Sequence, residues 1–158
     1  FDAGVRRGGL IAQDMVAIPI SAEHRMVVVA SPQCLQEQDF PTTPAQLLTL
    51  QCINLQLPTH GQNLPWTFLI NGQEQKLRVQ GQVIVNGINQ VHQACLDGYG
   101  LAYVPQALVQ DDIASGRLLT VLDDFTITFP GYYLYYTSRL KSSAAFNIIV
   151  EALRMPAL

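Results

Sequence analysis

Histidines and cysteines are the residues of this sequence best suited to chemistry, but their spacing argues against it. A zinc site needs CxxC or paired-histidine spacing, and neither occurs. His92 falls inside an expected helix, where we interpret it as a packing or surface residue, whereas His60 falls in a loop and could touch a ligand. We interpret Cys34, Cys52 and Cys95 as reduced, mostly buried thiols, so the sequence predicts no metal site and no disulfide.

Nucleophile and phosphate-binding motifs are also missing. The sequence contains no GxSxG, no GxxxxGK[ST] and no GxGxxG. Gly98-Tyr99-Gly100 lacks the third glycine and follows an expected helix, so we interpret it as a helix cap and turn. The paired acids Asp111-Asp112 and Asp123-Asp124 point apart on a helix or strand and indicate solvated loops or helix ends. We therefore expect no catalytic activity and no cofactor.

Composition narrows the classes of partner. The chain has 158 residues, of which 49% are hydrophobic and only 13% charged, and its net charge is −3. This composition predicts an apolar surface larger than a free-standing soluble domain would have. We expect a partner subunit, or a further piece of the same domain, to cover part of that surface. Lysines and arginines form no basic cluster, so we expect no direct binding to nucleic acid. Without a signal peptide or an apolar run of about 18 residues, we expect a cytoplasmic location away from membranes.

The elements that must position any site alternate between strands and helices. Strands are expected at residues 2–5, 15–20, 25–30, 52–57, 66–70, 75–80, 83–85, 101–104, 118–122 and 132–137. Helices are expected at residues 32–38, 44–50, 88–96, 105–116 and 142–154. Asn71-Gly72 predicts a tight hairpin turn between two of the strands. The alternation indicates an α/β protein with largely parallel pairing.

Aromatic residues gather in the segment that ends at Tyr136. A platform for single-stranded nucleic acid would need interleaved lysine or arginine, which this segment lacks. Alternation instead places Tyr133 and Tyr135 on one face of a strand and Tyr132 and Tyr136 on the other. We interpret the segment as a buried strand.

Five segments, in order along the whole chain, resemble the effector-binding domain of LysR-type transcription regulators. Each alone is weak, but their order and spacing together are specific. They are Phe1–Gly8 (FDAGVRRG), Arg25–Pro32 (RMVVVASP), Leu96–Pro105 (LDGYGLAYVP), Gly116–Leu118 (GRL) and Phe129–Tyr136 (FPGYYLYY).

The resemblance implies a two-lobed, periplasmic-binding-protein-like (type 2) α/β fold with mixed, mainly parallel sheets and an incomplete first lobe. Residues 1–30 and 129–158 would form part of lobe I, and residues 31–128 would form lobe II. The family further implies a homodimer or homotetramer, and DNA binding only through a winged helix-turn-helix that precedes Phe1.

The expected site follows from the fold, because open α/β sheets bind ligands at the carboxyl ends of their strands. Thr59 and Asn86 could hold a carboxylate, Asn86 as the cap of a helix N-terminus, and Arg6 could pair with an acidic effector. The alternatives are a loop residue, a simple helix cap and a surface charge. The candidate effector-binding residues are Arg6, Leu57, Pro58, Thr59, Asn86, Tyr103, Val104 and Pro105.

The functional expectation is a regulatory domain that binds a small molecule, possibly a carboxylate, between two lobes. Closure on the effector would change oligomer geometry and so control transcription. The alternative is a solute-binding protein of a transporter, which has a similar fold. Three unpaired cysteines and the crossover motifs weigh against it.

Overall fold

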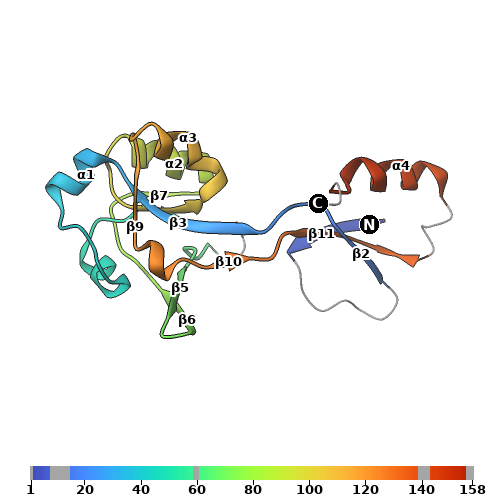
Figure 1. The fold of residues 1–158 in the computed structure, drawn as a ribbon, viewed down its shortest axis with the longest axis horizontal. Helices are drawn as coiled ribbons and strands as arrows, with labels where there is room; N and C mark the ends of the chain where they lie inside the picture. Colours follow the sequence, from blue (N-terminus) through green and yellow to red (C-terminus); the bar gives the residue numbers. More distant parts are fainter. Residues whose placement is uncertain (1, 8–14, 59–60, 139–142, 156–158) are drawn as a thin grey trace. The chain divides into compact units, whose positions relative to one another are not determined.

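The chain forms two compact units in a computed structural model that describes residues 2–7, 15–58, 61–138 and 143–155 (Figure 1). The first unit comprises residues 1–24 and 128–158, and the second comprises residues 25–127. The strand at residues 25–30 falls in the second unit, where residues 102–105 and 119–121 pair with it, and the lobe boundaries expected from the sequence stay a prediction.

The first unit is an antiparallel sheet with one helix. Its strand order is β1 (Ala3–Arg7), β11 (Tyr132–Thr137), β2 (Met15–Pro19). The aromatic segment is therefore a strand, as the sequence predicted, and its residues 134–136 are buried. Helix α4 (Ala144–Leu153) follows, and the hydroxyl of its N-cap Ser143 accepts a hydrogen bond from the Phe146 N–H. The small core of this unit is formed by Ile18, Leu134, Tyr136 and Val150.

The second unit is built around β3 (His24–Ala30), which begins at the last residue of the first unit's N-terminal segment. From Val27 to Ala30 every residue of β3 is buried. Strands β8 (Ala102–Pro105) and β9 (Leu119–Val121) flank it, both antiparallel. Beyond Ile127, the short strand β10 (Thr128–Phe129) leads the chain back to the first unit.

Parallel pairing continues this sheet on the far side of β8. A bridge joins Cys52 to Leu101 in parallel, and β4 (Asn54–Leu55) pairs in parallel with β7 (Ile84–Val85). The sheets are therefore mixed, but among the described strands only these pairings are parallel. The expectation of mainly parallel sheets, which rested on the alternation of strands and helices, is therefore wrong. Helix α3 connects β8 to β9, but these two strands do not pair with each other, because β3 lies between them and pairs antiparallel with both.

Two helices and a hairpin cover the two faces of this sheet. Helices α2 (Ile88–Leu96) and α3 (Gln106–Ala114) pack on a core that includes Val27, Ile53 and Val104. On the other face, the hairpin of β5 (Trp66–Ile70) and β6 (Gln73–Leu77) packs with Tyr103 and Val28. The shorter helices are α1 (Pro32–Glu37), η1 (Pro44–Thr49) and η2 (Asp123–Phe125).

Local sequence signals account for several of these boundaries. The Ser31 hydroxyl caps α1 by accepting from the Cys34 N–H at 3.2 Å. Asn71 and Gly72 have φ values of 51° and 76°, which is the paired left-handed conformation that an Asn-Gly hairpin turn requires. No helix within the described part of the chain is long and apolar enough to span a membrane.

Candidate functional site

The carboxyl ends of β4 and β7 meet at one edge of the second unit's sheet. Their register pairs Asn54 with Ile84 and Leu55 with Val85, and the Gln56 N–H then donates to the Val85 carbonyl at 2.7 Å. Because the strands run in the same direction, the chain leaves both at the same edge. Leu57 and Pro58 therefore follow β4 at the edge where Asn86 follows β7, and their contact with an effector stays a prediction.

The end of β8 belongs to the same edge. The parallel bridge between Cys52 and Leu101 gives β8 the direction of β4, and the ladder with β3 places Pro105 opposite Met26. Pro105 is partly exposed. The edge thus combines Pro105 with the amino end of β3, where Arg25 stands.

Tyr103 and Val104, expected as an apolar wall of the site, lie inside the unit. Tyr103 stacks on Trp66 with ring centroids 5.5 Å apart, and its hydroxyl donates to the Thr67 carbonyl at 3.1 Å. Val104 is fully buried in the core on the opposite face. In this conformation their side chains hold β8 in place behind the edge, and their contact with an effector stays a prediction.

Asn86 lies one residue outside the position that we expected for it. The N-cap of α2 is Gly87, with φ −132° and ψ 138°, and its carbonyl accepts from the Val91 N–H at 3.1 Å. The prediction that Asn86 caps the helix is therefore wrong: the helix begins one residue too late for its side chain to take that role. The exposed Asn86 is instead available to a ligand beside a helix start that has no side-chain cap.

Arg6 and Thr59 are not part of this geometry. Arg6 is exposed on β1 of the first unit, opposite Tyr133, and its contact with an effector stays a prediction. Thr59 and the neighbouring His60 lie outside the described residues.

Arg25 is a candidate that reasoning from the sequence missed. Its Nε and Nη2 atoms donate to the Thr126 hydroxyl at 3.2 and 3.1 Å, and Nη2 stands 3.8 Å from Asp123 Oδ1. The side chain remains 44% exposed, so its charge is held in place and still reachable. The available signal was a basic residue at the start of an otherwise apolar strand.

Asp112 contradicts our expectation of a solvated acid. Its side chain is only 5% exposed, with Oδ2 2.6 Å from His92 Nε2 and Oδ1 2.5 Å from Arg117 Nη2. The contact between the Arg117 guanidinium and Asp112 Oδ1 is an ion pair that does not have the geometry of a hydrogen bond. This cluster ties α2 to α3 and to the turn after α3, and among the described residues no group of side chains has the composition of a metal site.

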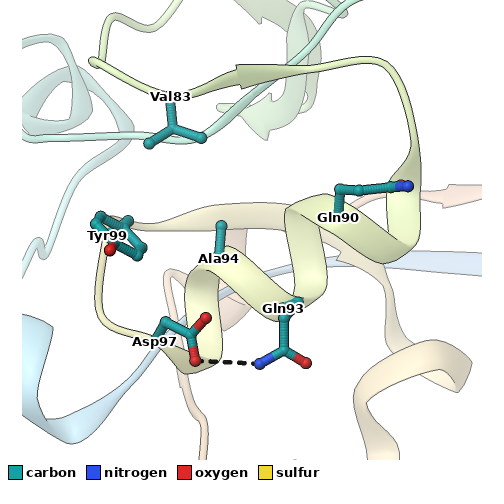
Figure 2. A pocket seen from close by; sticks show the side chains of 6 residues that line it. All are labelled: Val83, Gln90, Gln93, Ala94, Asp97 and Tyr99. Atoms are coloured by element: carbon teal, nitrogen blue, oxygen red, sulfur yellow. Dashed lines mark hydrogen bonds between the residues drawn. The ribbon is translucent and has the colours of Figure 1, made fainter.

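A shallow cavity of about 300 Å³ lies beside α2 (Figure 2). Two of its polar side chains are already paired, because Gln93 Nε2 donates to Asp97 Oδ1 at 3.1 Å. The rest of the lining is Val83, Gln90, Ala94 and Tyr99, which offers little to orient a ligand. The strand edge with Arg25 and Asn86 is the better candidate.

Comparison with known proteins bears on the identity of the chain. The family described as "LysR substrate binding domain" matches residues 1–155. The chain is 41% identical over 154 residues to the HTH-type transcriptional regulator PgrR of Escherichia coli K12 and to a putative transcriptional regulator of Pseudomonas aeruginosa PAO1. These alignments cover 98% of the chain and 52% and 50% of the relatives, so the chain spans about half the length of these regulators.

Solved structures show the same fold. The regulatory domain of AphB from Vibrio vulnificus superposes with a TM-score of 0.76 at 24% identity, covering 96% of this chain and 75% of that one. The regulatory domain of CrgA from Neisseria meningitidis superposes with a TM-score of 0.74 at 24% identity, covering 96% and 73%. Since the family match spans almost the whole sequence, the chain belongs to the LysR substrate-binding domain family.

Proposed function

We propose that this chain is the part of a LysR-type transcription regulator that senses a small molecule, and that the effector binds at the strand edge formed by Leu57, Pro58, Asn86 and Pro105. The observation that supports the proposal is parallel pairing, of β4 with β7 and of Cys52 with Leu101 before β8, which points the carboxyl ends of the three strands in one direction. The relatives named above are regulators, which supports this function over that of a transporter's solute-binding protein.

Arg25 suggests the chemistry of the effector. A carboxylate at this edge would form a charge-assisted hydrogen bond with the guanidinium, which at present has a hydroxyl partner and a carboxylate 3.8 Å away. Asn86 is a further amide donor at this edge, where it follows β7, three strands from Arg25 in the order β3, β8, β4, β7. The proposed effector is therefore a small organic acid. Thr59, and Arg6 from the first unit, stay as further candidates.

The proposal extends to the whole protein. In it, a winged helix-turn-helix of the longer chain binds DNA, and the regulator acts in the cytoplasm as a homodimer or homotetramer without catalysing a reaction. Effector binding changes the geometry of the oligomer because the ligand binds one conformation more tightly than another.

Calorimetric titration of the whole regulator with benzoate, malate and glutamate tests the site. We expect at least one acid to bind, and Arg25→Gln to weaken it about tenfold or more, since a hydrogen bond to a charged group contributes about 1.5–3 kcal/mol. Asn86→Ala should weaken it by a smaller factor. Lys76→Gln, an exposed cation on β6, is the control and should change nothing. Equal affinity in Arg25→Gln would overturn the assignment of the site.

A further inference from the structure

A second cavity, of about 450 Å³, lies beside β4 and the start of β7. Gln51 precedes β4 and Gln82 precedes β7, whereas Asn63 is bridged to Gln56 just beyond the carboxyl end of β4. Its volume is within the range of about 300–1,000 Å³ that small-molecule sites occupy. Five side-chain amides line it: Gln51, Asn54, Asn63, Gln80 and Gln82.

Asn54 is the most informative of these amides. The residue is only 2% exposed and lines the cavity. It alternates along the strand with Ile53 and Leu55, which face the core beneath α2, so it points to the other face of the sheet and lines the cavity. An amide that lines a cavity can donate hydrogen bonds to a ligand that enters it and accept hydrogen bonds from that ligand.

The backbone holds the other amides close to Asn54. The Cys52 N–H donates to the Gln80 carbonyl at 3.0 Å, and the Asn54 N–H donates to the Val83 carbonyl at 2.9 Å. Gly81 permits this approach, because a Cβ there would stand 1.7 Å from the Cys52 carbonyl oxygen. Gln80 and Gln82, on either side of Gly81, are thereby fixed at the rim.

The chemistry of the lining selects the class of ligand. Each side-chain amide both donates and accepts hydrogen bonds, as does each hydroxyl of a sugar or polyol. Among the described residues that line the cavity none is charged, and these residues offer no countercharge to a carboxylate or ammonium. Val79 and Ile84 add an apolar strip suited to the C–H face of a sugar ring. We propose that this cavity is a second small-molecule site, which takes an uncharged polyhydroxylated ligand of monosaccharide size.

This site does not depend on the proposed effector site. The two share no residue, and one offers a cation whereas the other offers only neutral amides. Their ligands should therefore bind independently of the substitutions made in the other site.

Side-chain amide resonances give a direct test. The whole regulator, labelled with ¹⁵N, is titrated with D-glucose, D-galactose and D-mannose, and separately with D-gluconate and D-galacturonate as charged counterparts. We expect at least one neutral sugar to shift the NH₂ resonances of Asn54 and Gln82, with those of Gln73 and Gln75 on β6 unmoved. The proposal fails if none of the three sugars shifts the Asn54 resonance, or if the acids shift it equally.

Two variants assign the binding to this cavity. Gln82→Ala removes an exposed amide at the rim, leaves the core intact, and should weaken the sugar about fivefold, the effect of one neutral hydrogen bond. Asn54→Leu should abolish the binding, and Gln75→Ala and Asn86→Ala should leave it unchanged. Unaltered affinity in Gln82→Ala and in a folded Asn54→Leu protein would overturn the proposal.

Discussion

At the scale of single residues, the buried thiols make the stability of the protein decrease with rising pH in the alkaline range. Burial raises the pKa of Cys52 and Cys95 from 9.0 to about 12. Unfolded thiols ionise near their ordinary value, so above about pH 9 the unfolded chain releases protons that the folded chain keeps. The stabilisation is complete below that pH, and we expect the free energy of unfolding to fall by about 1.4 kcal/mol per pH unit for each thiol as the pH rises toward 12.

Urea unfolding at about pH 8 and about pH 10.5 measures this slope. The Cys52→Ala/Cys95→Ala protein is less stable at every pH, but its stability should fall less between the two values, since neither substituted position can ionise. An identical fall in both proteins would show that other groups dominate the alkaline transition.

Individual side chains were predicted unevenly. The sequence predicted the buried cysteines from composition alone, and all three are buried and free of disulfides. It did not predict the buried Asp112, because its partner His92 is 20 residues away and only the packing of α2 on α3 brings the two together. Asn86 was predicted to be the N-cap of α2, but it lies one residue before the N-cap, Gly87. The residue types alone do not decide at which of these two positions the helix begins.

At the scale of elements, Gly81 sets how closely the segment before β7 approaches β4. An alanine there would force its Cβ against the Cys52 carbonyl, and backbone atoms cannot move aside as a flexible side chain can. We expect Gly81→Ala to lower the free energy of unfolding by about 1–3 kcal/mol, the usual cost of overpacking. Trp66, the single tryptophan of the chain, is buried in the second unit, so its fluorescence reports the unfolding of that unit.

Gln82→Ala is the matched control for this change. It alters an exposed side chain in the same segment and should shift stability by less than about 0.5 kcal/mol. If Gly81→Ala proved as stable as Gln82→Ala, the close approach to Cys52 would not be essential to the fold.

Elements defined by local chemistry were predicted from the sequence better than elements defined by distant partners. The Asn71-Gly72 turn and the Ser31 cap depend on neighbours in the chain, and both are confirmed. The strand expected at residues 52–57 is reduced to β4, because its flanking residues bond to three different segments in turn. Such partners are set by tertiary structure, which periodicity along one segment does not reveal.

At the scale of the whole molecule, the fold could be recognised because its motifs are spread over both units. The site was harder to predict, since a motif places a residue on a strand without saying whether its side chain faces the core. Tyr103 and Val104 show the difference: both belong to a correctly predicted strand, and both are buried.

The apolar composition noted in the sequence has a visible counterpart on α4. Ile148, Ile149 and Leu153 are 72%, 52% and 43% exposed on the outer side of this helix, a larger apolar surface than a helix usually leaves in water. We expect the 158-residue chain on its own to self-associate with increasing concentration. The Ile148→Lys/Ile149→Lys protein should sediment with a lower average mass at the same concentration, because lysine is costly to bury.

Charge alone would also reduce association, so the control must add the same charge without removing apolar surface. Glu151→Lys does so on the same helix, since Glu151 is exposed and the substitution changes the net charge by the same two units. We expect this variant to associate nearly as the unsubstituted chain does, because the apolar patch remains. A monodisperse monomer for the unsubstituted chain at every concentration, or an equal loss of association in Glu151→Lys, would mean that the exposed isoleucines of α4 do not drive self-association.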